Sequence, residues 1–462
     1  MKNFILMFLT VFMLIISAGK AMANHEMPAP PDTVTSIADR SAALLIIEDA
    51  KKLYTEGKVR DALIKFRQAA VKDPNSWKPP YWISNCHYSL DNYGFALQYA
   101  LQAVSMDKEI DKDIYELLGK SHHRLGNLDS AIVYYQIAAE KLSKSAVKDL
   151  RISEKIEECK YAKLQLANAP FAEKVKMPGE VNSGYHDYSP ILVNGGKGLY
   201  FTSRRNNTTG GMMNPDDDLY FEDIYYAQWN EEEAKWDSVT NSLDRLNGLG
   251  FESISYISRD GLNAMMVINN TQAEDEPIQT RSSDIFELQY TNKGKWGKPK
   301  AINNKSINTS YFDACPTVTA DGNTMYFVSD RNMSKKMTDI YVVQKVGKTW
   351  GVAVPLDSVN TTGNETTPYI TPDGRYLFFS SDRLSGMGGY DIYVTENLGS
   401  TWSKPVNLGA AVNTVNNDTH FQYYPDLKKA VFAGFMLQGQ KASLDLYEID
   451  MTNFVMPKAE TK

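Results

Sequence analysis

The chain has 462 residues, a length that predicts two to four domains. Apolar residues make up 43% of it and charged residues 23%, so ordinary hydrophobic cores are expected. Mean hydropathy is negative, which excludes a polytopic membrane protein. The 49 Lys and Arg residues are outnumbered by 56 Asp and Glu residues, for a net charge of -7, so nucleic-acid binding is not expected. Three cysteines are too few for a disulfide framework or a cysteine-rich zinc site.

Residues 1–23 have the pattern of a secretory signal peptide. Lys2 precedes an apolar run from Phe4 to Ile16, and Ala21-Met22-Ala23 then supplies a small-x-small cleavage site. The run is short for a transmembrane span, and no cysteine follows it, so a lipoprotein anchor is not expected. We expect an exported, periplasmic protein whose mature chain begins at Asn24, with an uncleaved anchor as the alternative. Residues 24–40 contain three prolines and are expected to form a flexible leader.

Residues 41–167 show helical spacing with a repeat of about 34 residues. Small residues and aromatics recur at matching positions, which are Ala62, Phe66 and Ala69, then Ala96, Ala100 and Ala103, then Ala131, Tyr135 and Ala138. Small residues let antiparallel helices approach closely, and the pattern resembles the tetratricopeptide repeat. Three repeats are expected over residues 43–145, with residues 146–167 as an extra helix that caps the stack. The two cysteines of this half, Cys86 and Cys159, are expected to be buried thiols.

A stack of such repeats presents a concave groove. The first-helix residues expected to face it are Lys51, Tyr54, Asn85, Tyr88, Lys120 and His123. The groove either takes a peptide tail or forms a solvated face beside the second domain. The carboxylate-binding set of the family matches only partly, since Asn85 fits but Ile47 and Asp113 stand where basic residues are needed.

From residue 168 the pattern changes to short alternating strands with turn dipeptides. Five units each contain a third strand that opens with aspartate, an aliphatic residue and an aromatic: Asp223-Ile224-Tyr225, Asp284-Ile285-Phe286, Asp339-Ile340-Tyr341, Asp391-Ile392-Tyr393 and Asp445-Leu446-Tyr447. Five units of four short strands predict a β-propeller over residues 168–455, with a tail at 456–462. Five blades are expected, and six are the alternative.

An asparagine precedes an acidic residue by five positions in every unit. The pairs are Asn182/Asp187, Asn247/Glu252, Asn308/Asp313, Asn360/Glu365 and Asn413/Asp418. The first asparagine comes before any complete unit, while the fifth unit lacks a fourth strand after Tyr447. Residues 171–183 are therefore predicted to supply the outer strand of the last blade and to close the ring.

Residues 365–418 carry the fullest motif, with Pro-Asp-Gly, Ser-Ser-Asp-Arg, Gly-Gly-Tyr-Asp-Ile-Tyr, Trp-Ser-Lys-Pro and Asn-Leu-Gly. The units resemble the WD-like repeat of the Tol-Pal propeller protein, in the form common in Bacteroidota. The order of signal peptide, tetratricopeptide stack and propeller is similar to periplasmic components of type IX secretion and gliding machinery. The resemblance implies a scaffold bound to an outer-membrane-associated protein complex. Those relatives often continue into an OmpA-like domain that has no counterpart here, so peptidoglycan binding is not expected.

The repeated acids are expected to ring one mouth of the propeller channel. They are Asp187, Glu252, Asp313, Glu365 and Asp418. The ring either holds a cation or a basic peptide, or each carboxylate accepts backbone N–H groups and locks adjacent blades. Two long loops, residues 206–222 and 269–283, are expected on the same face. The first carries Met212, Met213, Asp216, Asp217 and Asp218, which we expect to contact a protein partner.

Charge supports this choice of face, because residues 168–462 carry a net charge of -9 whereas residues 33–167 carry +2. No catalytic constellation, cofactor motif or metal-binding histidine spacing is found, so neither an enzyme nor a bound cofactor is expected. The favoured function is a non-catalytic scaffold that binds a protein partner in the cell envelope, without nucleic acid and without a membrane span. The alternative is a sensor that binds a small ligand or a glycan in the propeller funnel.

Overall fold

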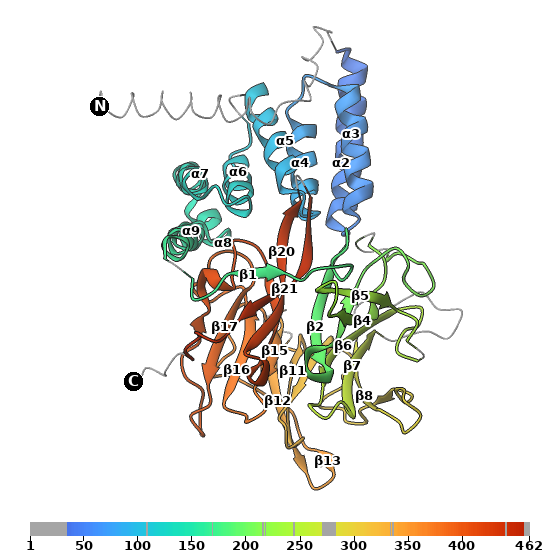
Figure 1. Ribbon diagram of the computed structural model, residues 1–462. Helices are drawn as coiled ribbons and strands as arrows, with labels where there is room; N and C mark the ends of the chain where they lie inside the picture. The colour runs from blue at the N-terminus through green and yellow to red at the C-terminus, as the bar shows by residue number, and fades with distance from the viewer. Residues whose placement is uncertain are drawn as a thin grey trace.

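The computed structural model describes residues 35–456 apart from 108–109, 169, 215–216, 218, 244, 270–282, 333, 335–336 and 439–440. The predicted signal peptide, most of the predicted leader and tail, the interior of the 269–283 loop, Asp216 and Asp218 lie outside the described residues. Helices form the N-terminal part of the described chain, up to Ala167, and strands form the longer C-terminal part (Figure 1). The fold is a tetratricopeptide solenoid followed by a five-bladed β-propeller, as the sequence predicts.

Three antiparallel helix pairs form the solenoid. They are α2 (Ile37–Thr55) with α3 (Val59–Lys72), α4 (Lys78–Ser89) with α5 (Tyr93–Met106), and α6 (Ile114–Arg124) with α7 (Leu128–Lys141). The first helix begins before the predicted start at residue 43, because Ser36 caps it by accepting a hydrogen bond from the Asp39 N–H. The cap of the stack is two helices instead of the predicted one, a short α8 (Lys144–Asp149) and α9 (Ile152–Ala167).

The repeated small residues lie at the helix contacts. The alanines that define the repeat are fully buried, and so is the ring of Phe66. At Gly119 a Cβ atom would lie 2.6 Å from the Tyr135 ring, so no larger residue fits without displacing that ring. Cys86 and Cys159 are both buried free thiols, in agreement with the sequence.

Five four-stranded sheets make the blades of the propeller, and blade 3 has one extra short strand. Blade 1 contains β2 (Asp187–Val193), β3 (Gly198–Ser203), β4 (Asp223–Asn230) and β5 (Lys235–Thr240). Blade 2 contains β6 (Phe251–Ile257), β7 (Asn263–Asn269), β8 (Asp284–Gln289) and β9 (Lys300–Ala301). Blade 3 contains β10 (Asp313–Val318), β11 (Thr324–Ser329), β12 (Asp339–Val346), β13 (Thr349–Trp350) and β14 (Val354–Pro355). Blade 4 contains β15 (Glu365–Ile370), β16 (Tyr376–Ser381), β17 (Asp391–Glu396) and β18 (Val406–Asn407).

Blade 5 combines strands from both ends of the propeller. Its strands are β19 (Asp418–Tyr424), β20 (Lys429–Gln438), β21 (Lys441–Asp450) and β1 (Lys174–Lys176), in the order β1-β21-β20-β19. β1 pairs with β21 in antiparallel register, with Val175 opposite Glu448. The predicted ring closure is therefore confirmed, through a strand shorter than the 171–183 segment assigned to it.

The five asparagines have one structural role. Each side-chain amide accepts a hydrogen bond from the N–H of the residue after the third-strand aspartate and donates one to the carbonyl of that same residue. The pairs are Asn182–Leu446, Asn247–Ile224, Asn308–Ile285, Asn360–Ile340 and Asn413–Ile392, at donor–acceptor distances of 2.6 to 3.1 Å. The side-chain amide thus satisfies a backbone N–H that strand pairing leaves open and adds a second donor to the carbonyl, which in four of the blades also accepts a backbone N–H.

Candidate interaction surface

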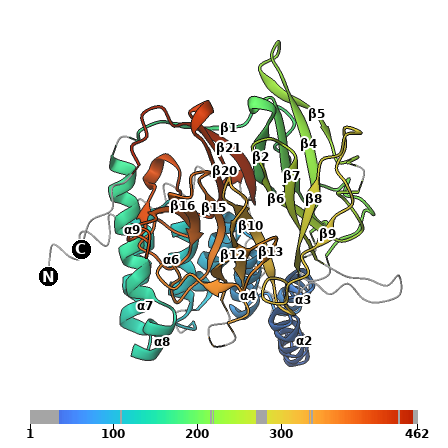
Figure 2. The same ribbon diagram turned by 90° about the horizontal axis from the view of Figure 1, so that it is seen from below.

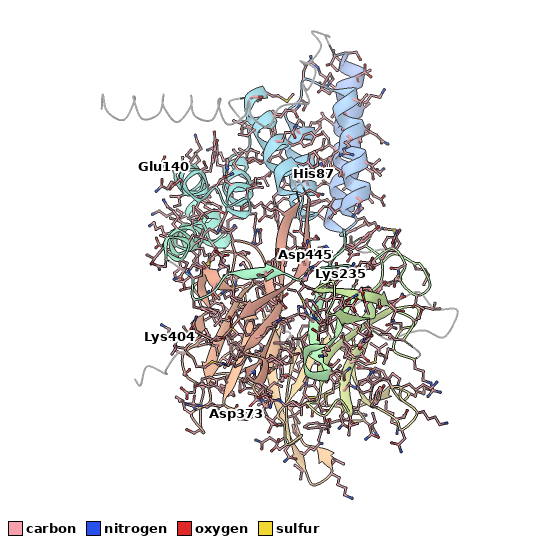
Figure 3. The ribbon with its side chains drawn as sticks, in the orientation of Figure 1. His87, Glu140, Lys235, Asp373, Lys404 and Asp445 are labelled. Carbon is pink, nitrogen blue, oxygen red and sulfur yellow. The ribbon has the colours of Figure 1, made fainter. Side chains whose placement is uncertain are left out.

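The helices stand over one end of the propeller (Figure 1). Figure 3 shows Asp445 at the end of blade 5 nearest the helices and Asp373, in a turn between strands, at the opposite end. The repeated acids begin the first strands at the helix-facing end, where the loops between second and third strands also lie. The face that the sequence assigns to a partner is thus the face on which the helical stack is mounted.

The side chains of the acid ring point into the protein and not toward solvent. Four of its carboxylates accept hydrogen bonds from the backbone N–H, at 2.6 to 2.7 Å, and the hydroxyl of the residue four positions earlier, in the pairs Ser183–Asp187, Thr309–Asp313, Thr361–Glu365 and Thr414–Asp418. All four side chains are fully buried. These contacts are those of the structural alternative, in which each acid fixes the loop between neighbouring blades.

Two of the acids also pair with an arginine from the end of the second strand. Arg205 Nη2 lies 3.1 Å from an oxygen of Asp187, and Arg331 pairs with Asp313 in the same way. Glu252 departs from the pattern because Gly248 stands where the other loops have a hydroxyl residue. Burial, with only the Gly248 and Gly250 N–H groups as donors, raises the pKa of Glu252 to about 7.

The helical stack is joined to the propeller by buried polar contacts. His123 in α6 donates from Nε2 to the Met387 carbonyl at 2.8 Å, since a carbonyl oxygen can only accept. The next residue, Arg124, donates from Nη1 to the Val415 carbonyl at 2.9 Å. Met387 itself is fully buried and packs in a cluster with residues of α7 and α9. Burial lowers the pKa of His123 to about 4, so the imidazole stays neutral at physiological pH.

Blade 5 makes a second contact with the stack. Its β20–β21 hairpin extends toward α4 and α5 (Figure 1). Phe435 on this hairpin packs beside Tyr93 of α5, with ring centroids 6.1 Å apart, and beside His186 of the propeller. Tyr93 in turn lies 5.3 Å from the ring of Tyr88, which the sequence places in the concave groove. Blade 5 therefore contacts α5 next to a residue predicted to face the groove.

A cavity of about 180 Å³ remains at this junction, with basic residues on most of its helical wall. Its charged lining residues are Lys120, Arg124, Arg151, Lys155, Glu158 and Asp382. Glu116, 6% exposed, lies 3.2 Å from Lys120 and 2.6 Å from Lys155 and neutralises part of this charge. The ammonium of Lys120 stands 4.5 Å from the centroid of the Tyr88 ring.

The other predicted groove residues lie in the half of the groove built by α2 and α4. The Tyr54 hydroxyl contacts the Ser89 hydroxyl at 2.9 Å, and Lys51 lies over the Trp82 ring. Asn85 donates to the Tyr81 carbonyl of its own helix at 3.0 Å. Tyr54 and Tyr88 are half-buried, so their rings remain accessible to a partner.

The predicted contact loop, residues 206–222, is anchored by a two-pronged ion pair. Arg204 binds both oxygens of Asp217 at 2.7 and 2.9 Å and also donates to the Tyr220 carbonyl. Asp217 is therefore an internal anchor of the loop as well as a candidate contact. Met212 and Met213 are 39% and 46% exposed. Of the predicted loop residues that the structure describes, these two offer apolar surface to a partner.

The opposite mouth of the propeller forms a funnel that no sequence motif singled out. A cavity of about 680 Å³ is lined by residues from all five blades, among them Tyr256, Tyr369, Tyr423 and Tyr424. Tyr424 accepts a hydrogen bond from the Leu192 N–H at 2.8 Å, which fixes its ring. Arg259 and Asp426 form an exposed ion pair at the rim. The only sequence signal was the position of these residues at the ends of first strands.

Within the described ranges, no three His, Cys, Asp or Glu side chains converge as a metal site would require. No helix there is both long enough and apolar enough to cross a bilayer.

No protein-family model and no curated protein matches the chain. Solved structures similar to it are tetratricopeptide and chaperone domains. The first tetratricopeptide domain of Spaghetti (RPAP3), bound to an HSP90 peptide, is 22% identical, with 25% of this chain and 93% of that chain covered and a TM-score of 0.23. The type III secretion chaperone SycD of Yersinia enterocolitica, in complex with a peptide of the translocator YopD, is 21% identical, with coverage of 27% and 95% and a TM-score of 0.25. PcrH from Pseudomonas aeruginosa is 23% identical, with coverage of 26% and 92% and a TM-score of 0.24.

Proposed function

We propose that this protein is an exported, non-catalytic scaffold that holds a protein partner within a bacterial cell-envelope complex. The observation that carries the proposal is the junction between the two modules. His123 and Arg124 bind propeller carbonyls, and Met387 is buried among the helices. Two folds that typically bind proteins are thereby held in one fixed relative orientation, which can position a partner that contacts both of them.

The envelope location rests on the sequence. The apolar run from Phe4 to Ile16 and the Ala21-Met22-Ala23 site support export to the periplasm. The order of modules and the propeller motifs of residues 365–418 support a role beside an outer-membrane-associated complex, similar to type IX secretion and gliding components. Lipid attachment and peptidoglycan binding are not part of the proposal.

Two accessible surfaces suit a partner. One is the Met212–Met213 segment, which is held in place by the Arg204–Asp217 pair. The other is the part of the groove around Tyr54 and Tyr88, which is half-buried in the free protein. Aromatic and methionine side chains on fixed supports are typical of protein interfaces.

The test is affinity purification of the tagged full-length protein from cross-linked envelopes, with mass spectrometry of the bait and of what it carries. We expect an N-terminus at Asn24 without lipid and one defined protein partner in constant ratio to the bait. An intact Met1, or a cytoplasmic protein without a partner, would contradict the proposal.

The funnel supports a second candidate function, a sensor for a small ligand or a glycan. The supporting observation is the cavity of about 680 Å³ lined by four tyrosines. Replacement of Tyr256 and Tyr369 by alanine separates the two functions. The scaffold reading expects partner recovery to be unchanged, whereas the sensor reading expects loss of ligand binding measured by calorimetry against periplasmic extracts.

A further inference from the structure

Two segments of the propeller are basic in an otherwise acidic domain. Residues 290–305 contain five lysines and residues 344–354 contain two, and neither segment contains an aspartate or a glutamate. We call these two segments together the lysine edge; its lysines are Lys293, Lys295, Lys298, Lys300, Lys305, Lys345 and Lys348. The segments belong to the outer parts of blades 2 and 3.

The structure joins the two segments into one surface. Asn304 donates from Nδ2 to the carbonyls of Trp350 and Gly351 at 2.9 and 2.7 Å. The Ala353 N–H donates to the Ser306 hydroxyl at 3.0 Å, which ties the neighbouring residues together as well. The lysines of both blades are therefore held on a common rigid support. Figure 1 places β13, which lies in this region, at the end of the propeller away from the helices, and Figure 2 shows it from below.

Between the two blades lies a cavity of about 650 Å³ with an apolar wall. Tyr256, Met265 and Trp350 contribute to that wall, and Lys298, Lys300 and Lys345 also line the cavity. Lys345 stands 4.8 Å from the centroid of the Trp350 ring. Beside the cavity, Val346 and Val352 are 71% and 77% exposed. The region thus combines concave apolar surface with positive charge.

Most of this positive charge is not neutralised within the chain. Among the described residues, every lysine of the edge except Lys295 lacks an ion pair. Lysines on the outer strands of blades 1 and 5 differ, since Lys235 pairs with Glu233 and Lys176 with Asp445. Protection of a strand edge against aggregation needs only scattered lysines, so it does not account for seven of them in two adjoining segments.

Three carboxylates also line the cavity, and each accepts a hydrogen bond from another side chain of the protein. Glu287 accepts from the Trp350 indole at 3.0 Å, Asp321 from the Thr319 hydroxyl at 2.6 Å, and Asp260 from the Ser258 hydroxyl at 2.5 Å. Three lysines and three carboxylates line the cavity itself. Outside the cavity, Lys293, Lys305 and Lys348 add positive charge that no ion pair among the described residues neutralises, so the lysine edge as a whole is positive. An occupant of opposite charge is therefore favoured.

We propose that the lysine edge binds an acidic segment of a partner protein, with an apolar side chain of that segment seated in the cavity between blades 2 and 3. A protein segment is favoured over a membrane because the apolar part of the site is a concave, inter-blade cavity, which an extended chain can enter and a bilayer surface cannot. The site is separate from the helix-covered face and does not depend on the function proposed above.

The test uses the full-length mature protein and a fluorescent decapeptide of alternating glutamate and leucine. Fluorescence anisotropy should show saturable binding that weakens as salt is added. The variant Lys298→Glu/Lys300→Glu/Lys345→Glu should bind about tenfold more weakly, since several exposed charge pairs are removed together. The matched control is Lys144→Glu/Lys148→Glu/Lys404→Glu, three exposed lysines away from the edge, and it should bind as the wild type does (Figure 3 labels Lys404).

A second variant tests the cavity. Trp350→Ala should weaken binding of the glutamate–leucine peptide. The same variant should bind a glutamate–serine peptide of the same charge as weakly as the wild-type protein does. The proposal is overturned if the glutamate–leucine peptide does not bind, if both triple variants lose binding equally, or if a glutamine–leucine peptide binds as well. Stronger binding to phosphatidylglycerol vesicles than to the peptide would also overturn it, and would assign the edge to a membrane surface instead.

Discussion

The side-chain amide of Asn182 binds both backbone groups of Leu446, a residue 264 positions later in the chain. The Leu446 N–H donates to Asn182 Oδ1 at 2.6 Å, and Asn182 Nδ2 donates to the Leu446 carbonyl at 3.1 Å. The same amide also donates to the Met177 carbonyl, so it fixes the chain that carries β1. The contact repeats in the other four blades, but only here does it join the two ends of the propeller.

Asn182→Ala should therefore destabilise the protein more than the same substitution at an asparagine that does not join the two ends of the propeller. Asn308→Ala removes an equivalent amide clamp from blade 2 and is the matched control. Each variant leaves a buried backbone N–H unpaired, that of Leu446 or that of Ile285, at a cost of about 2 kcal/mol in the free energy of unfolding. Only Asn182→Ala should also release β1 and expose the edge of β21. Denaturant unfolding and light scattering test this, and equal aggregation of both variants would contradict the role of Asn182 in closure.

Glu252 should make the protein less stable as pH rises. Its pKa is about 7 in the folded state, above the ordinary value of 4.5. The free energy of unfolding is therefore highest at low pH, where this carboxyl is protonated in both states, and it falls as pH rises from 4.5 to about 7. Oε2 of this buried carboxyl has no hydrogen-bond partner in the described structure. Glu252→Gln should accordingly raise the free energy of unfolding at pH 8 and change it little at pH 5.

The control for that change is Glu365→Gln. The Glu365 carboxylate accepts from the Thr361 N–H and from two hydroxyls, so an amide there turns a donor toward donors and should lower stability at pH 8. Urea titrations at the two pH values compare the variants. A Glu252→Gln effect that is the same at both would show that Glu252 does not titrate in this range.

The helix–propeller junction should depend on the His123 and Arg124 contacts. The double variant His123→Ala/Arg124→Ala removes both hydrogen bonds to propeller carbonyls, and within the stack it also removes the contact of the His123 ring with Tyr135. We expect one thermal unfolding transition for the wild type and two for the variant. His122→Ala, which removes a ring stacked on Tyr134 inside the stack, should keep one transition at lower temperature. A single transition for the double variant would contradict this dependence and would mean that the apolar contacts of Met387 and Phe435 are enough to couple the modules.

Periodicity in the sequence predicted the architecture because each blade and each helix pair is built by a repeated local rule. The five asparagines and their spacing to the acids gave both the blade number and the closure at Asn182. Whether the repeated acids are buried or exposed was harder to predict, since burial of Asp187 or Asp418 depends on the loop hydroxyl four residues earlier. The alternative of a structural role, stated from repetition alone, matches the contacts observed.

Features that depend on tertiary placement had no such signal. The Met387 and Val415 carbonyls accept hydrogen bonds from helix side chains, and a backbone acceptor leaves no mark in a sequence. Arg124 follows Lys120 by one helical turn, and this spacing was the only sign in the sequence that Arg124 lies on the same helix face as a predicted groove residue. The Phe435 hairpin looks like any other strand pair until its contact with Tyr93 is seen. Sequence reasoning treated the helical groove and the acid-ring face as separate surfaces, whereas the helical stack stands over that face of the propeller.

The exposed methionines of the 206–222 loop should contribute to partner binding. Met212→Ser/Met213→Ser leaves the Arg204–Asp217 pair in place, which shortening of the loop would not, so the fold should be unchanged. Partner recovery from cross-linked envelopes should fall several-fold, because buried apolar side chains carry much of the energy of an interface. Leu398→Ser, at another exposed apolar residue, is the control. Unchanged recovery here, together with loss in Tyr54→Ala/Tyr88→Ala, would move the site to the helical groove.

If helices and propeller act as one platform for a protein partner, uncoupling them should release that partner. The most direct measurement is the ratio of partner to bait recovered from cross-linked envelopes for the wild type and for His123→Ala/Arg124→Ala, with His122→Ala as control. We expect a constant ratio for the wild type and the control and a clear loss for the uncoupled variant at equal bait abundance. An unchanged ratio in a variant shown to unfold in two transitions would contradict it.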